Sequence, residues 1–124
     1  MPVLVTASQL ELHGDDLADW GFRPGAKEEG TCHLRGRMLS TANEVKTGIW
    51  ECTPGAFDVL NRPNVESIVI IKGKVKLTDL STGAEKVLGA GDCAVLEFGS
   101  SVKWEILETT RKFFVVAPVQ TSSL

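Results

Sequence analysis

The residue whose chemistry stands out is Glu66, a carboxylate at the start of the most hydrophobic segment of the chain. The segment from Asn61 to Asp79 reads NRPNVESIVIIKGKVKLTD and contains no histidine. Because side chains alternate along a strand, Glu66 shares a face with Ile68 and Ile70. An unpaired ionised carboxylate on an apolar face is costly unless it protonates or meets a cation. Glu66 is therefore the candidate catalytic residue.

Glu66 has three ways to avoid that cost, and the sequence leaves all three open. It could pair with a cation inside the fold, for which the candidates are Arg62, Arg111 and Lys112. It could stay protonated, which would suit it to proton transfer. It could face a cationic or hydrogen-bonding ligand. The structural alternative is that Glu66 lies at the wet end of its strand and binds a nearby backbone amide or basic side chain.

Two tryptophans extend this candidate site. Aromatic walls with one or two polar groups are the usual composition of a small-ligand pocket. Trp50 and Trp104 are the candidate walls, and plain core packing is the alternative for each. Lys112 would be the counter-charge of Glu66 if it faces inward, and a solvated lysine if it faces outward.

The elements that must position these residues are strands. From about residue 31 onward the apolar residues follow a period of two, as in GKVKLTD and VKWEIL. Turn sequences separate the segments: STG at 81–83, GAGD at 89–92 and GSS at 99–101. About eight short strands at intervals of roughly 8–12 residues are typical of an all-β sandwich or barrel. The weakest strand candidate is CHLRGRML, because Gly36 lies inside it.

The first 30 residues differ from the rest of the chain. Helical spacing occurs only in SQLELHGDDLADWGF, where two Asp residues and a Gly weaken it. We predict that residues 1–30 form an irregular arm that packs on the barrel or on a partner subunit. Residues 31–120 are the predicted domain.

Composition excludes several classes of protein. The chain has 124 residues, 43% of them hydrophobic and 23% charged, which is ordinary for one globular domain. With a formal charge of −3 and no run of Lys or Arg, we expect no nucleic-acid partner. No apolar stretch approaches the ~20 residues of a membrane span. The N-terminus lacks the pattern of a signal peptide and the three cysteines are widely spaced, so we expect a cytoplasmic protein without membrane contact.

The order of several motifs resembles the small single-domain cupins related to (S)-ureidoglycine aminohydrolase. The likeness covers roughly residues 45–117 and rests on Trp50, Pro54-Gly55, Glu66, Gly73, Gly91-Asp92, Trp104 and Arg111-Lys112. It implies a double-stranded β-helix, the RmlC-like cupin jelly-roll barrel, with a pocket at one mouth. In that fold the faces that carry Glu66 and Trp104 would point into the barrel.

The resemblance also implies a metal site, which this sequence does not keep. Cupins usually hold a divalent metal with three histidines and the glutamate. The histidine positions correspond to about Asn61, Pro63 and Val102, of which Asn61 alone could offer an oxygen to a ligand. We therefore predict no metal site and no cofactor, although a weakly held divalent cation remains open. The chain's own histidines are expected at surface or structural positions: His13 and His33.

Three functions follow, in order of preference. The first is a cupin that binds a small polar metabolite in its barrel, with Glu66, Lys112 and Asn61 as polar groups and Trp50 and Trp104 as walls. The second is a metal-assisted amidohydrolase-type enzyme that acts on ureidoglycine or a related ureide. The third is a non-catalytic dimeric scaffold. A homodimer is expected in each case.

Overall fold

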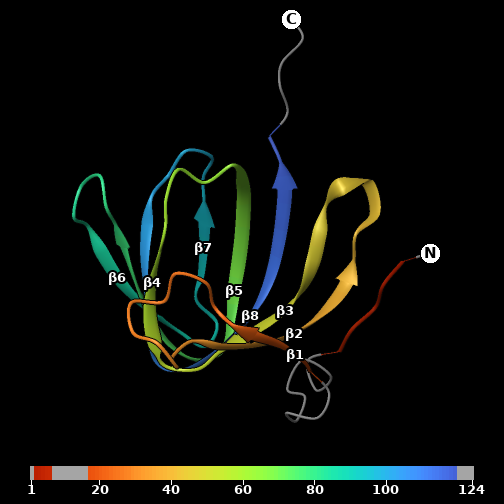
Figure 1. Cartoon of the computed structure of the whole chain (residues 1–124). Helices are drawn as coiled ribbons and strands as arrows, with labels where there is room; N and C mark the ends of the chain where they lie inside the picture. Colours follow the sequence, from red (N-terminus) through yellow and green to blue (C-terminus); the bar gives the residue numbers. More distant parts are fainter. Residues whose placement is uncertain (1, 7–16, 120–124) are drawn as a thin grey trace, which may run out of the picture.

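The computed structural model describes residues 2–6 and 17–119, which form a nearly all-β structure (Figure 1). A short 3-10 helix, η2 (Ala42–Glu44), interrupts the strands. The strands are β1 (Ala18–Phe22), β2 (His33–Ser40), β3 (Lys46–Cys52), β4 (Gly55–Val59), β5 (Asn64–Asp79), β6 (Glu85–Gly89), β7 (Cys93–Leu96) and β8 (Val102–Pro118). The predicted all-β class is confirmed.

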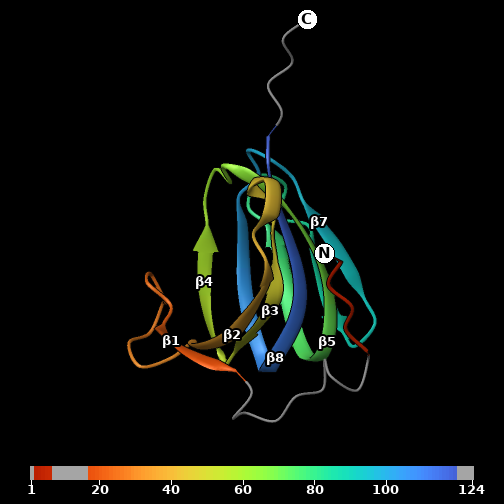
Figure 2. The same ribbon diagram turned by 90° about the vertical axis from the view of Figure 1, so that its right-hand side faces the viewer.

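Two long strands, β5 and β8, hold the two layers of the barrel together. They pair with each other from Asn64↔Pro118 to Asp79↔Val102. The first half of β5 also pairs with β7 and its second half with β6, while β8 pairs with β4 at one end and with β3 at the other. One layer therefore runs β1-β2-β3-β8-β5-β7 and the other β4-β8-β5-β6. Figure 2 shows β4 and β7 on opposite sides of this barrel.

The single strand β5 has 16 residues and is longer than the short strands that the sequence predicts, because Gly73 lies within it without ending its pairing with β8. The register of β5 against β8 shifts between Ile70 and Val75, where both strands pass from one layer to the other. Gly73 has φ +97°, and a Cβ on it would lie 2.6 Å from the Cα of Thr110. The buried Thr110 hydroxyl accepts a hydrogen bond from the Lys74 N–H at 3.2 Å. The corner therefore needs glycine.

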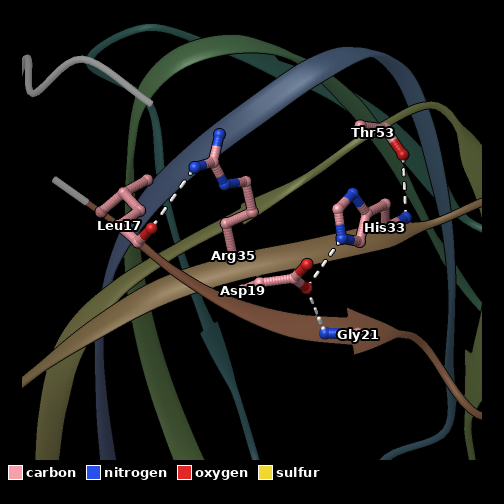
Figure 3. A network of polar contacts seen from close by, with 6 residues as sticks. All are labelled: Leu17, Asp19, Gly21, His33, Arg35 and Thr53. Carbon is pink, nitrogen blue, oxygen red and sulfur yellow. Dashed lines mark hydrogen bonds and ion pairs between the residues drawn. The ribbon is translucent and has the colours of Figure 1, made fainter. Parts of the chain in front are cut away.

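The prediction of an irregular arm is wrong for residues 18–22, which form β1 and pair with β2. Asp19 connects the two strands: its Oδ1 contacts His33 Nε2 and accepts from the Gly21 N–H, both at 2.8 Å (Figure 3). These hydrogen bonds, Gly21 first and His33 second, lower the pKa of the Asp19 carboxyl. His33 therefore has a structural contact. His13 and most of the segment with helical spacing lie outside the described residues.

Trp20 explains the glycine that made β2 a weak strand candidate. A Cβ on Gly36 would lie 2.6 Å from Trp20 Cζ2, inside the indole ring. The side chain of Trp20 thus lies directly on the backbone of β2, and only glycine leaves it room. This contact brings a residue of the predicted arm against the barrel.

The inward faces of the strands carry the core that the period-two pattern predicts. Ile68 and Ile70 in β5, and Val102, Trp104 and Ile106 in β8, are all buried. No helix in the described part of the chain has the length and apolarity that crossing a membrane requires.

The three cysteines are free thiols in two environments. Cys32 and Cys52 are fully buried at the core, whereas Cys93 is exposed. Burial, and next the neighbouring Cys32, raise the pKa of the Cys52 thiol far above its ordinary value. Cys52 therefore stays protonated at neutral pH and is a poor nucleophile.

Candidate functional site

A cavity of about 310 Å³ lies within the barrel. Both layers contribute to it, and four of the predicted site residues line it: Trp50, Glu66, Trp104 and Lys112. Its other lining residues are Trp20, Arg23, Leu34, Met38, Lys46, Phe57, Val59, Arg62, Phe114 and Val116. The structure thus brings together, at one place, a carboxylate, several cations and five aromatic rings.

Glu66 lies between two cations inside the cavity. Its Oε2 is 2.7 Å from Lys112 Nζ, and its Oε1 is 3.0 Å from Arg62 NH1. All three residues are buried, with 6%, 5% and 8% of their surface exposed for Glu66, Lys112 and Arg62. Of the three ways to stabilise Glu66, the structure has the first, pairing with cations inside the fold. Each carboxylate oxygen has its own charged donor, which makes these contacts strong.

Lys112 faces inward and lies between the two predicted aromatic walls. Its Nζ is 4.3 Å from the ring centre of Trp50 and 4.3 Å from that of Trp104. Overall the pKa of the Lys112 ammonium is lowered, because the effect of burial outweighs the opposing negative charge of Glu66, and the positive charges of Arg62 and Arg23 add to the lowering. The Glu66 carboxylate and the faces of the aromatic rings are the groups that stabilise the charged form.

Arg111, another candidate partner for Glu66, points to the opposite side of the sheet. In the β3–β8 register Trp50 is opposite Lys112, and Glu51 is opposite Arg111. Arg111 NH2 donates to Glu51 Oε2 at 2.7 Å, and both side chains are buried. The alternation of side chains along β8 separates the two basic residues, so each carboxylate receives a different one.

Asn61 was predicted to bind the ligand, and the structure does not bring it into the cavity. Asn61 has φ +48° in the turn before β5, and its backbone N–H donates to Ser101 Oγ at 2.9 Å. The left-handed turn leaves the residue exposed. Its neighbour Arg62, four residues before Glu66, lines the cavity instead.

Several lining residues were not predicted from the sequence. Lys46 lies on the same face of β3 as Trp50, four residues away, so strand alternation could have identified it. Arg23 and Trp20 belong to the predicted arm, and no pattern in the sequence places them at the cavity. Arg23 reaches it by lying over the ring of Phe57, with 4.4 Å from Cζ to the ring centre.

The charge of this cavity is opposite to that of the protein. Four cationic side chains and one carboxylate line it, a surplus of three positive charges, whereas the formal net charge of the chain is −3. Among the residues that the structure describes, Arg23 and Lys46 form no ion pair. Positive charge beyond what the described carboxylates neutralise indicates a site for a negatively charged group.

A second cavity, of about 470 Å³, opens elsewhere in the barrel. Its apolar lining includes the buried residues Leu77, Leu88, Leu96 and Val102. None of its charged residues is buried. It lacks the convergent buried charges of the first cavity, so we place the candidate site in the smaller one.

The sequence pattern of the EutQ-like cupin domain matches residues 39–114, more than half of the chain. The chain belongs to the EutQ-like cupin family. The resemblance to cupins is therefore confirmed at the level of the fold and of this family. The narrower likeness to ureidoglycine aminohydrolase stays a prediction. A comparison with curated proteins found no match.

Solved structures similar to this cupin include EutQ proteins. The EutQ protein of Salmonella typhimurium is 20% identical with a TM-score of 0.63, over 81% of this chain and 79% of that one. The chain spans 65% of the Clostridium difficile EutQ structure, at 18% identity, 72% coverage of this chain and a TM-score of 0.61. The polyketide cyclase RemF of Streptomyces resistomycificus is 20% identical with a TM-score of 0.64, over 90% and 86%. These likenesses support the jelly-roll fold.

The residues of this cupin do not fit the divalent metal that its fold implies. Both oxygens of Glu66 already contact cations, and an ammonium and a guanidinium beside a metal ion would repel it. The other expected ligand positions carry the exposed Asn61, Pro63 and the buried apolar Val102. Among the described residues, no three His, Cys, Asp or Glu side chains gather where they could hold a metal ion.

Proposed function

We propose that this cupin binds a small polar metabolite in its barrel through Lys112, Arg62 and Glu66. The observation that carries this proposal is the buried charged group itself. Burying three ionised side chains among aromatic rings costs free energy. If the core served only to stabilise the fold, apolar residues of similar volume would often do so at least as well. A cavity at the small end of the usual range of about 300–1,000 Å³ suits a metabolite rather than a polymer.

A thermal-shift screen with small acids, amines and ureides tests this proposal. A ligand present at 100 times its Kd should stabilise the fold by roughly 2.7 kcal/mol, a rise of several degrees in Tm. Replacement of Trp50 by Leu should abolish the rise, because Trp50 lines the cavity. Phe98→Leu is the matched control, since Phe98 is 60% exposed and lies outside the cavity. If no compound of any charge raises Tm, the proposal is wrong.

An enzyme of ureide chemistry is the second candidate. The resemblance to ureidoglycine aminohydrolase supports it, with Glu66 as the acid or base. The reaction in those relatives relies on a metal, and the paired state of Glu66 leaves that ion no free oxygen in this cupin. Stoichiometric manganese, nickel or zinc in the purified protein would place this function first.

We also propose a cytoplasmic homodimer, formed through the outer face of β7, β5 and β8. Exposed Val95 and Val69 lie there beside half-buried Val115 and Phe113 in adjacent register positions. A single apolar face of this kind supports a two-fold interface. Sedimentation should show a dimer at micromolar concentration, and Val95→Lys should shift it to a monomer. A strict monomer of the unaltered chain would remove both this interface and the function as a dimeric scaffold.

A further inference from the structure

The charge balance around Glu66 determines which ligands the cavity can attract. Lys112 and Arg62 carry two positive charges against the single negative charge of Glu66, so these three side chains together have a net positive charge. A cationic ligand would have to displace a buried cation to reach the carboxylate. The arrangement thus disfavours the amines that a lone buried glutamate would attract.

The cationic side chains of Arg62, Arg23 and Lys46 have hydrogen-bond donors that the described residues do not use. Arg62 uses NH1 for both of its side-chain contacts, to Glu66 Oε1 and to Asn64 Oδ1 at 3.2 Å. Its Nε and NH2 make no hydrogen bond to the described residues, and Arg23 and Lys46 form no ion pair with them. A guanidinium with free donors matches the two oxygens of a carboxylate in a bidentate contact.

The walls of the cavity are flat as well as apolar. The rings of Phe57 and Trp104 stack at 5.7 Å with an angle of 14°, and Trp50 meets Trp104 at 62° with 5.7 Å between ring centres. Trp20 and Phe114 complete the aromatic lining. A lining with this share of aromatic side chains favours a planar conjugated body over a bulky aliphatic one.

We infer that the cavity takes a small planar organic anion, an aromatic or conjugated carboxylate, held by Arg62, Arg23 and Lys46 against the tryptophan walls. The inference rests on the proposed function and narrows its ligand to one chemical class. The cavity of about 310 Å³ limits that ligand to a small molecule.

Calorimetric titration with matched probes tests the inference. Benzoate and 2-naphthoate are the anionic probes, benzamide is the neutral isostere, benzylamine the cation and cyclohexanecarboxylate the non-planar acid. We expect one of the aromatic acids to bind at least tenfold more tightly than benzamide and benzylamine, and several-fold more tightly than cyclohexanecarboxylate. Higher salt should weaken the binding.

Variants of Arg23 and Lys46, here called the rim residues, test which cationic side chains bind the acid. Arg23→Gln and Lys46→Gln should each weaken the binding of the aromatic acid at least threefold without lowering Tm. The matched controls are Arg37→Gln and Lys86→Gln, which remove exposed charges outside this cavity and should change nothing.

The outcomes separate the two proposals. If benzamide or benzylamine binds as tightly as the acids, or if the controls weaken binding as much as the rim variants, the anion inference is overturned while metabolite binding survives. If only the acids bind and only the rim variants weaken them, both stand. If no probe binds and the wider screen also finds nothing, both fall.

Discussion

Replacement of Glu66 by Gln is expected to destabilise the fold by about 3–5 kcal/mol, the usual cost of removing one partner from a buried ion pair. The amide keeps the shape of the side chain but removes the charge. Lys112 and Arg62 would then face each other in the barrel without compensation, at 5% and 8% exposure. Chemical denaturation of the variant beside the unaltered chain measures the loss.

The double variant Glu66→Gln/Lys112→Met is the informative control for this result. Methionine keeps most of the volume of lysine and removes the uncompensated charge, so much of the lost stability should return. Glu108→Gln breaks a pair in which both side chains are more than half exposed, 3.6 Å from Lys74, and should leave Tm nearly unchanged. A gain in stability in Glu66→Gln with unchanged ligand binding would mean that the buried charge has no function.

Replacement of Gly73 by Ala should cost about 2–6 kcal/mol, an effect of similar size to that of Glu66→Gln. A left-handed backbone costs a side chain about 1–3 kcal/mol, and forcing an extra methyl into packed atoms costs about 1–3 kcal/mol more. At Gly73 the methyl would meet the backbone of Thr109 and Thr110, which cannot move without opening the β5–β8 corner. Thermal and chemical unfolding measure the sum of the backbone cost and the packing cost.

Gly83→Ala separates the two terms. Gly83 has φ +79°, similar to Gly73, but nothing lies within 4 Å of the position of its Cβ. It should show only the backbone cost and lose less stability than Gly73→Ala. If the two variants lose the same amount of stability, the packing of β5 against β8 does not require glycine at position 73.

The period-two pattern predicted much of the fold and part of the site. It assigned Glu66 to the buried face of its strand, and the prediction that Lys112 would be the counter-charge if it faced inward agrees with the structure. It did not show that the segments around Gly73 form one strand, because local alternation carries no information on how a strand bends between layers. That bend depends on the partner strand, at Thr110.

The rest of the site depends on contacts that no local pattern encodes. Trp20 and Arg23 come from a segment without strand periodicity, and they reach the cavity only because β1 pairs with β2. Asn61 matched a histidine position of the cupin motif only with a spacing one residue short, and a left-handed turn directs it outward. As a result, the sequence pointed to one carboxylate, whereas the structure has a cavity with a surplus of positive charge.

A crystal structure of the protein grown with the tightest-binding aromatic acid tests the surroundings of Glu66 most directly. We expect Glu66 within hydrogen-bond distance of Lys112 and Arg62, and density for the acid with its carboxylate on Arg62 or Arg23. A metal ion coordinated by Glu66, or a Glu66 side chain that faces bulk solvent, would contradict this expectation.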